Sequence, residues 1–300
     1  MRIESVVKWL TENGYKISYK GDFNAEICGF ASLNTCEDGK ITWVKKKENY
    51  EKMDDHSGVT VAVVQEGLEL DVPNQIIAAN SKEVFFAILH HYWGSERQRG
   101  FIGEGTFISR EAEIDPSAYI GYNCSIVGNV RIGANTVIEN NVVIQGRVTI
   151  GERCYIQSQS VIGIDGFGYS KDPETGEKTM IEHFGGVKIG NDVFIASHVN
   201  IARGTIDDTV IMDGVKIAPS THIGHNNHIG ENATIICANL FGSVTTGKDA
   251  YIVASTIQNQ SVVGAHSVIG MGSVVTKPIP DNVVAFGIPA KVTKENNTDL

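Results

Sequence analysis

An isoleucine recurs at every sixth position over a long central stretch of the chain, from Ile102 to Ile162. The members between these two are Ile108, Ile114, Ile120, Ile126, Ile132, Ile138, Ile144, Ile150 and Ile156. A six-residue period does not fit an α-helix, but it fits one short strand and one turn per hexad, with the isoleucine pointing inward. Three hexads close a triangular coil, and successive coils stack at about 4.7–4.9 Å. The period therefore predicts a parallel β-helix in which each coil contacts only its neighbours.

The period returns after each of two interruptions, so the predicted β-helix domain spans residues 101–281. Its later members are Ile189, Ile195, Ile201, Ile211, Ile217, Ile223, Ile229 and Ile235, followed after a slip by Ile257, Val263, Ile269 and Val275. The first interruption, residues 163–186, is too long for a corner and is expected to be a loop excursion. Such excursions from a rigid scaffold often carry function, although a tolerated surface insertion fits the same sequence. Glycine after several of the isoleucines is expected to allow positive φ at a corner.

Residues 1–100 follow a different pattern, which predicts a small α/β domain. Residues 58–64 and 75–79 are apolar runs typical of buried strands. Asn80 and Glu83 have the spacing of a capping box at the start of a helix. The domain contains no glycine loop of the kinds that bind phosphate in nucleotide-binding folds.

One segment of this domain, residues 41–50, combines aromatic and basic side chains. Trp43 and Tyr50 flank three consecutive lysines, of which Lys46 is the middle one. Aromatic rings beside cations suit a nucleotide, because the base can stack and the phosphates can be neutralised. A half-buried edge strand followed by a solvated basic turn fits the segment equally well.

Composition excludes several classes of protein. The net charge of −10 argues against nucleic-acid binding, which depends on Lys and Arg neutralising phosphates. Five scattered cysteines without a Cys-x-x-Cys pair indicate reduced thiols. No apolar run approaches the roughly 18–20 residues of a membrane-spanning helix, and no signal peptide opens the chain. We therefore expect a cytoplasmic protein.

Several motifs together resemble the UDP-3-O-acylglucosamine N-acyltransferases of lipid A synthesis. In the β-helix they are DGFGY within residues 156–172, RG-x-x-DDT within 187–217, and the HN pair within 223–230. GFASL (29–33) and ITWVKKKENY (41–50) are similar to the N-terminal nucleotide-binding domain of that family. The resemblance covers most of residues 1–280.

The resemblance implies a homotrimer of left-handed parallel β-helices with active sites between neighbouring subunits. It also implies direct transfer of an acyl group from an acyl thioester to a sugar amine. By position, His225 matches the catalytic base of the family. Trp43 and Tyr50 match its pair of uracil-stacking aromatics, and Lys46 falls near its diphosphate-contacting asparagine.

The chain departs from the family pattern at several positions. Gln260 stands where the family has a second active-site histidine, and Ala202 replaces the aspartate of Asp-Arg-Gly. Ala218 and Pro219 replace an Asp-Asn pair before the catalytic histidine. Residues 282–300 form a short C-terminal tail in place of the helical extension that engages acyl carrier protein.

These departures favour an acyl-CoA donor and a nucleotide-linked amino deoxysugar acceptor, in the synthesis of a cell-surface glycan. The acidic balance of the chain points the same way, because acyl carrier protein is itself strongly acidic. The alternative is lipid A synthesis, in which UDP-3-O-acylglucosamine is acylated from acyl carrier protein. In either case no tightly bound cofactor is expected.

The proposed chemistry centres on His225, since imidazole titrates nearest to neutral pH and can take the proton that an attacking amine sheds. Counting three hexads back from Ile223 places Asp207 or Asp208 beside this histidine. Such a carboxylate could orient the ring, or it could merely cap a corner. Four further side chains are expected to contact the substrate: Asn226, Gln260, Phe167 and Tyr169. No cysteine is needed as a nucleophile, so a ternary complex is expected.

Two other classes of protein are alternatives. A zinc carbonic anhydrase of the β-helix type needs three converging histidines, and His222, His225 and His228 are evenly spaced. That spacing distributes them over two faces, so they should not converge within one subunit. We expect His222 and His228, with His198 and His266, to be structural surface residues. A non-enzymatic scaffold would not explain the DGFGY loop or the HN pair.

Overall fold

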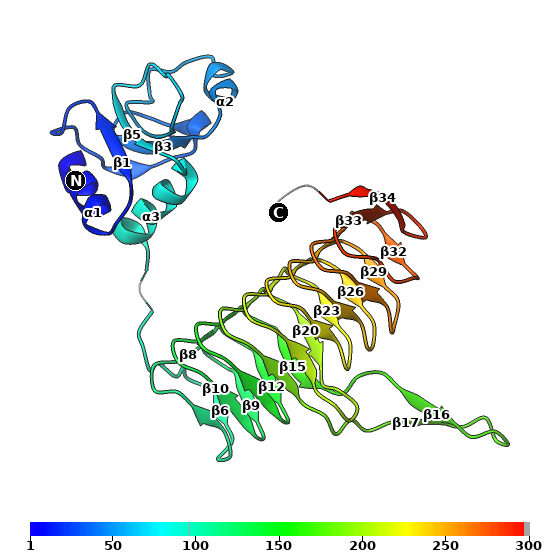
Figure 1. The fold of residues 1–300 in the computed structure, drawn as a ribbon. Helices are drawn as coiled ribbons and strands as arrows, with labels where there is room; N and C mark the ends of the chain where they lie inside the picture. The colour runs from blue at the N-terminus through cyan, green and yellow to red at the C-terminus, as the bar shows by residue number, and fades with distance from the viewer. Residues whose placement is uncertain (96, 297–300) are drawn as a thin grey trace. The chain divides into compact units, whose positions relative to one another are not determined.

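The computed structural model describes residues 1–95 and 97–296. The chain divides into two compact units, Met1–Glu96 and Arg97–Leu300 (Figure 1). The second unit is a parallel β-solenoid and the first is a small α/β unit, which confirms the predicted fold class. No helix among the described residues is long and apolar enough to cross a membrane.

The N-terminal unit is built on a five-stranded sheet in the order β1-β5-β4-β3-β2, with β1 antiparallel to β5 and the other pairs parallel. Its strands are β1 (Ile17–Lys20), β2 (Gly29–Phe30), β3 (Lys40–Val44), β4 (Val61–Gln65) and β5 (Asn74–Ala78). Its helices are α1 (Ile3–Glu12), the 3₁₀ helix η1 (Leu33–Thr35), α2 (Lys47–Glu51) and α3 (Ser81–Trp93). The start of α3 confirms the predicted cap, because the Asn80 side chain accepts a hydrogen bond from the backbone N–H of Glu83.

Residues on the two faces of this sheet belong to separate apolar clusters. Ile41 and Val63 pack into the cluster that contains α1 and α3. Val44 and Val64, which alternate with them along the same strands, pack into the cluster beneath α2. A side chain on β3 therefore reaches one cluster or the other, but not both.

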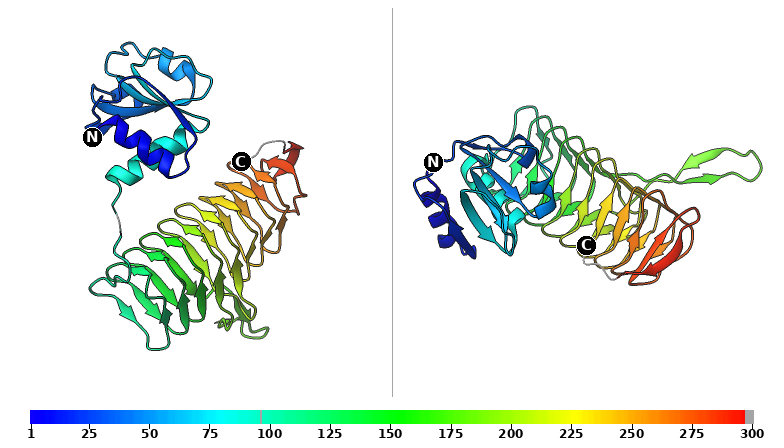
Figure 2. Two further views of the ribbon diagram at one scale, coloured as in Figure 1. Left: turned by 60° about the vertical axis from the view of Figure 1, so that its left-hand side comes forward. Right: turned by 90° about the horizontal axis from the view of Figure 1, so that it is seen from above.

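The solenoid has three faces, each a sheet of short strands that are parallel except for the last strand of face 3, β34, which is antiparallel to β33 (Figures 1 and 2). Face 1 contains β6 (Phe107–Ile108), β9 (Ser125–Val127), β12 (Val143–Gln145), β15 (Val161–Ile164), β20 (Asn200–Ala202), β23 (His222–Ile223), β26 (Asn239–Leu240), β29 (Thr256–Ile257) and β32 (Val274–Val275). Face 2 contains β7 (Glu113–Ile114), β10 (Val130–Ile132), β13 (Val148–Ile150), β18 (Val187–Ile189), β21 (Thr209–Ile211), β24 (His228–Ile229), β27 (Thr245–Thr246) and β30 (Val262–Val263). Face 3 contains β8 (Tyr119–Ile120), β11 (Val137–Ile138), β14 (Tyr155–Ile156), β19 (Phe194–Ile195), β22 (Lys216–Ile217), β25 (Thr234–Ile236), β28 (Tyr251–Val253), β31 (Val268–Ile269), β33 (Val283–Phe286) and β34 (Lys291–Glu295).

The periodic isoleucines stack directly on one another and form the core of the solenoid. Ile144 pairs in register with Ile162, one coil later, and both are completely buried. Ile102 is 54% exposed because it belongs to the first coil, which has no coil beneath it. The later slip places Leu240 and Thr246 at core positions in register with Ile223 and Ile229. The composition of the core therefore follows from the repeat, and the residues that differ from isoleucine or are exposed lie at the first coil and after the slip.

The glycines that follow the periodic isoleucines serve a different purpose from the predicted one. Gly121 and Gly133 do not have positive φ, whereas Asn123 and Asn135, two residues further on, do. A Cβ added at Gly133 would lie 2.7 Å from the backbone of Gly151 in the next coil. These glycines are required by the close approach of the neighbouring coil, and asparagine supplies the left-handed residue of the corner.

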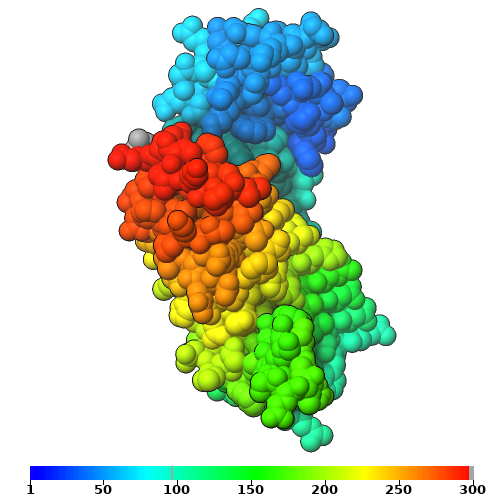
Figure 3. Space-filling model, turned by 90° about the vertical axis from the view of Figure 1, so that its right-hand side faces the viewer, coloured from blue at the N-terminus to red at the C-terminus, as the bar shows by residue number. Residues whose placement is uncertain are grey.

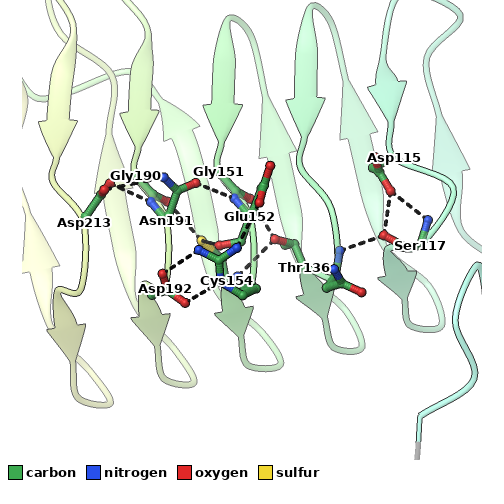
Figure 4. Close-up of polar contacts among 12 residues, drawn as sticks. Asp115, Ser117, Thr136, Gly151, Glu152, Cys154, Gly190, Asn191, Asp192 and Asp213 are labelled. Carbon is green, nitrogen blue, oxygen red and sulfur yellow. Dashed lines mark hydrogen bonds and ion pairs between the residues drawn. The ribbon is translucent and has the colours of Figure 1, made fainter.

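Polar side chains link successive coils at the corner between faces 2 and 3 (Figure 4). The Asp213 carboxylate accepts a hydrogen bond from the backbone N–H of Asn191 at 2.8 Å. The Asn191 side chain in turn accepts one from the N–H of Glu152 at 2.9 Å. One coil further, Thr136 accepts from the N–H of Cys154 at 3.1 Å. Turn N–H groups that have no strand partner are thereby satisfied by the adjacent coil.

Both interruptions of the repeat fall at the corner between faces 1 and 2, here named corner 1–2. The first follows β15 and includes an antiparallel hairpin of β16 (Tyr169–Lys171) and β17 (Lys178–Met180), which projects from the solenoid (Figures 1 and 3). The second is the longer turn between β20 and β21. At the other end of the solenoid, β33 and β34 add to face 3 within the segment predicted as a tail, of which residues 297–300 lie outside the described residues.

Candidate active site

A cavity of about 520 Å³ lies along corner 1–2. The turns after β15, β20, β23, β26 and β29 all reach this corner, because these strands are neighbours on face 1. Five successive coils thus contribute to the cavity. Its lining residues are Ile164, Asp165, Gly166, Phe167, Asn200, Ala202, His222, Gly224, His225, Phe241, Gly242, Ser243, Asn259 and Gln260.

His225 lies in the turn after β23, and its two ring nitrogens have different surroundings. Its Nδ1 is 3.0 Å from Oδ1 of Asn226. That oxygen also accepts a hydrogen bond from the backbone N–H of Thr205 at 3.0 Å, so it is an acceptor and Nδ1 carries the hydrogen. Nε2 keeps its lone pair and lies beside Gly242, where an added Cβ would be 2.5 Å away. In this tautomer His225 can act as a neutral base.

Asn226 orients this histidine, whereas the sequence predicted that it contacts the substrate. Its Nδ2 donates to the backbone carbonyl of Asp207 at 3.0 Å, so both ends of the amide are engaged within the corner. Its φ of 58° is a left-handed conformation that asparagine adopts more readily than most residues. The amide is therefore held in place before any substrate arrives.

Neither Asp207 nor Asp208 contacts His225 through its carboxylate, contrary to the count of hexads. The strand β23 pairs with β20 in the register Ile223 with Ile201, so the coil neighbour of His225 lies at the start of the turn after β20. The turn is longer than a hexad corner and carries both aspartates past the histidine. Only the backbone of Asp207 reaches the site, through Asn226.

The Asp208 carboxylate instead secures the base of the excursion. It is 9% exposed and accepts hydrogen bonds from Arg147 at 2.6 Å, from Lys188 at 2.9 Å and from the backbone N–H of Gly186 at 2.8 Å. Burial alone would raise the pKa of this carboxyl, but the bonds from Lys188, Gly186 and Arg147 hold the pKa below its usual value. Asp208 is thus a structural anion that joins three coils.

The excursion brings a second histidine, His183, against His225. The two ring centroids are 5.3 Å apart and the planes are inclined at 76°. His183 is 3% exposed, although it belongs to a segment that otherwise lies largely on the surface. This contact could not be predicted, since the excursion has no period from which a position could be counted.

His222 also lines the cavity, whereas the sequence placed it among structural surface histidines. Its Nδ1 is 2.9 Å from Oδ1 of Asn200 on the neighbouring strand. Burial lowers the pKa of His222, and the nearby His225 lowers it further. The neutral form of His222 is favoured, so the cavity wall offers a second imidazole beside His225.

Two of the other predicted substrate contacts, Phe167 and Gln260, line the cavity. Phe167 is 79% exposed and is available to a ligand. Tyr169 lies further out on β16 and does not line the cavity; the Nζ of Lys178 is 4.6 Å from its ring centroid. Ala202, which replaces the aspartate of the family motif, is part of the cavity wall.

Trp43 and Tyr50 are not brought together in the N-terminal unit. Trp43 packs with Phe85 and Phe86 of α3 on one side of the sheet. Tyr50 is buried in the cluster on the other side, and its hydroxyl donates to the Asp71 carbonyl at 2.8 Å. Two rings on opposite faces of a sheet cannot sandwich one base. Lys46 is exposed at the start of α2.

A metal centre is not evident in the described part of the chain, which holds no group of three or more His, Cys, Asp or Glu side chains arranged to bind an ion. His222 and His225 lie at the same cavity, while His228 is exposed on face 2. The three histidines of the carbonic anhydrase alternative therefore do not converge within the subunit.

Stacked hexapeptide coils with a histidine in a corner cavity are typical of the hexapeptide-repeat acyltransferases. The bacterial transferase hexapeptide family (six repeats) matches residues 129–163. The UDP-3-O-acylglucosamine N-acyltransferase of Coxiella burnetii is 33% identical over 284 residues, which cover 86% of this chain and 82% of that protein. The chain belongs to the family of UDP-3-O-acylglucosamine N-acyltransferases and is an N-acyltransferase.

Further relatives share the name of this family or the fold. The UDP-3-O-acylglucosamine N-acyltransferase of Bordetella pertussis is 37% identical over 132 residues, or 43% of this chain and 36% of that protein. Among solved structures, LpxA from Acinetobacter baumannii superimposes with a TM-score of 0.59 at 26% identity, over 65% of this chain and 74% of that chain. The UDP-N-acetylglucosamine acyltransferase of Francisella novicida has a TM-score of 0.54 at 26% identity, over 65% and 69%.

Proposed function

We propose that this protein transfers an acyl group from an acyl thioester to the amino group of UDP-3-O-acylglucosamine. The observation that carries the proposal is the tautomer of His225, whose Nε2 keeps its lone pair at the cavity while Nδ1 is held by Asn226. The names of the relatives support this acceptor better than the amino deoxysugar that the sequence favoured.

In the proposed reaction, the sugar nitrogen attacks the thioester carbonyl as Nε2 of His225 takes one of its protons. A C–N bond forms, and the C–S bond then breaks as the thiol leaves with a proton returned by the imidazolium. No covalent enzyme intermediate is needed, so both substrates are bound together.

The developing oxyanion requires a donor close to His225, and the backbone N–H of Gly242 is the proposed one. Gly242 lies against Nε2 of His225 in the next coil. Its N–H makes no hydrogen bond to another described residue. A backbone donor on a rigid corner needs no reorganisation as charge develops on the carbonyl oxygen.

A second candidate keeps the same chemistry but uses acyl-CoA and a nucleotide-linked amino deoxysugar. Ala202 and Gln260 favour it, because both line the cavity at positions where the resemblance predicts an aspartate and a histidine. Residues 1–100 are proposed to bind the nucleotide in either case.

A homotrimer is also proposed. Phe184 and Ile206, which are 71% and 76% exposed, give corner 1–2 an apolar surface that a second copy could cover.

A four-way assay separates the candidates. The same acyl chain is offered on acyl carrier protein and on CoA, with UDP-3-O-acylglucosamine or a UDP-linked amino deoxysugar as acceptor, and the N-acylated product is measured by mass spectrometry. We expect the highest kcat/KM with UDP-3-O-acylglucosamine and a kcat lower by roughly 10²–10⁴-fold in His225→Gln. Faster transfer to the deoxysugar would establish the second candidate, and full activity of His225→Gln would remove the base.

A further inference from the structure

The buried histidine of the excursion, His183, has one nitrogen that is bonded and one that is not. Its Nδ1 lies 3.0 Å from the backbone carbonyl of Ile181. A carbonyl oxygen only accepts, so Nδ1 carries a hydrogen, and in the neutral ring Nε2 has the lone pair. That Nε2 is buried and has no hydrogen-bond partner among the described residues. An unsatisfied buried acceptor carries a desolvation cost that a purely structural histidine would avoid.

Gly166, in the DGFGY loop, lies between this histidine and His225. A Cβ added to Gly166 would be 2.8 Å from Nε2 of His183 and 2.8 Å from Cδ2 of His225. The unbonded nitrogen and the edge of the His225 ring therefore face the same point. The ring planes are inclined at 76°, with centroids 5.3 Å apart, which is an edge-to-face contact.

Cδ2 of an imidazole becomes more positive when the ring is protonated. The unbonded Nε2 of His183 carries partial negative charge, so its position beside that edge favours the protonated state of His225. The carboxylates of Asp207 and Asp208 do not supply this stabilisation, because neither contacts His225. Asn226, the orienting group on Nδ1, is uncharged.

We propose that His183 is a positioning residue that holds the ring of His225 and stabilises the imidazolium formed when His225 takes the proton of the attacking amine. The inference rests on the proposed function, and it gives the excursion a role in the chemistry. The excursion after β15 carries Gly166 at its start and His183 near its end, so both of its ends close on the base.

Steady-state kinetics of His183→Phe test the charge contribution. Phenylalanine keeps a flat ring in the same space but has neither the lone pair nor the N–H. We expect kcat to fall about threefold to tenfold, the size of one neutral hydrogen bond converted to a rate, with KM for both substrates changed less than twofold. His183→Gln, which can donate to Ile181 and still present an oxygen, should recover more than half of kcat. The matched control is His228→Phe, at an exposed histidine of face 2. Wild-type kcat in His183→Phe overturns the charge-stabilising role.

A second measurement needs no substrate, so it stands even if the proposed acceptor is wrong. Diethylpyrocarbonate acylates unprotonated imidazole nitrogens, and peptide mass spectrometry gives the rate at His225 itself. We expect His225 to react severalfold faster in His183→Ala than in the wild type, because the ring is no longer held against Gly166. Thermal melting checks that the solenoid remains folded. An unchanged rate in the folded His183→Ala variant overturns the positioning role.

Discussion

The Nδ1 of His225 donates to the side-chain oxygen of Asn226, the next residue in the chain, over 3.0 Å. An amide thus occupies the place that a carboxylate holds in a Ser-His-Asp triad. The amide orients the ring and selects its tautomer without adding a negative charge. Two adjacent residues can do this only because Asn226 has a left-handed backbone that turns its side chain back toward the histidine.

Replacing this amide should lower the rate, because His225 and the backbone groups of Thr205 and Asp207 all lose a partner. In Asn226→Gly the backbone keeps its φ of 58°, which glycine adopts freely, but His225 loses its acceptor. We expect kcat to fall about tenfold to a hundredfold, the value of one buried hydrogen bond expressed as a rate. Asn232→Gly, at a corner with φ of 56°, is the matched control and should retain full kcat. Equal rates for the two variants would mean that Asn226 does not orient the base.

The two glycines of the DGFGY loop should differ sharply in their tolerance of alanine. A Cβ at Gly166 would press on both His183 and His225, whereas a Cβ at Gly168 would meet nothing within 4 Å. We expect Gly166→Ala to lose more than tenfold in kcat/KM and Gly168→Ala to match the wild type. Steady-state kinetics with either thioester donor measure this difference. Normal turnover by Gly166→Ala would show that the loop yields easily and does not hold the histidines.

Asp208 should contribute to stability and not to chemistry. Asp208→Asn removes the charge that Arg147 and Lys188 surround, and we expect the free energy of unfolding to fall by about 1–3 kcal/mol. Urea unfolding followed by circular dichroism measures it. Asp207→Asn, at the exposed neighbour, is the control and should change the free energy little. A large loss of kcat in Asp208→Asn at unchanged stability would restore the catalytic role predicted from the sequence.

His222 should make stability depend on pH just below neutrality. Burial and the neighbouring His225 lower its pKa, while in the unfolded chain the pKa is about 6.5. Above about pH 6.5, His222 is neutral in both the folded and the unfolded chain, and its contribution to stability is fully present. As the pH falls below that value, His222 takes up a proton in the unfolded chain first. Stability is then lost until the pH reaches the lowered pKa of the folded chain. Urea unfolding between about pH 7.5 and pH 5 should show a steeper loss for the wild type than for His222→Gln. Parallel curves would contradict the shift.

Trp43 should act through packing. Trp43→Ala removes its contacts with Phe85 and Phe86, and we expect the N-terminal unit to lose about 2–4 kcal/mol of unfolding free energy. Lys46→Ala, at an exposed position, is the control and should unfold like the wild type. Titration calorimetry with UDP on both variants completes the test. Unchanged stability with weakened UDP binding in Trp43→Ala would favour the base-stacking role that the resemblance implies.

Most of the solenoid could be predicted because its determinant is periodic and local. Each periodic isoleucine from Ile120 onward is buried, and the register of one coil repeats in the next. The capping box of Asn80 and Glu83 was predictable for the same reason, since both partners lie within one turn of helix.

The candidate site was less predictable because its geometry depends on the lengths of irregular turns. His225 could be named from its motif, but the orienting side chain could not be, because the longer turn after β20 displaces Asp207 and Asp208 from the counted position. His183 lies in a segment without a period, so nothing in the sequence placed it against the base. The separation of Trp43 from Tyr50 depends on which side of the sheet each ring enters.

The cavity is lined by one corner of five successive coils, so its contact residues are arranged in five layers along the solenoid axis. Each coil offers its own side chains about 4.8 Å beyond those of the last, so an elongated ligand that slides by one coil meets an entirely new set of neighbours. Recognition along the axis therefore changes in steps of one coil. A change in one coil, such as Ala202 in place of the family's aspartate, can therefore alter what one segment of a substrate contacts while the base and its neighbours on adjoining coils stay as they are.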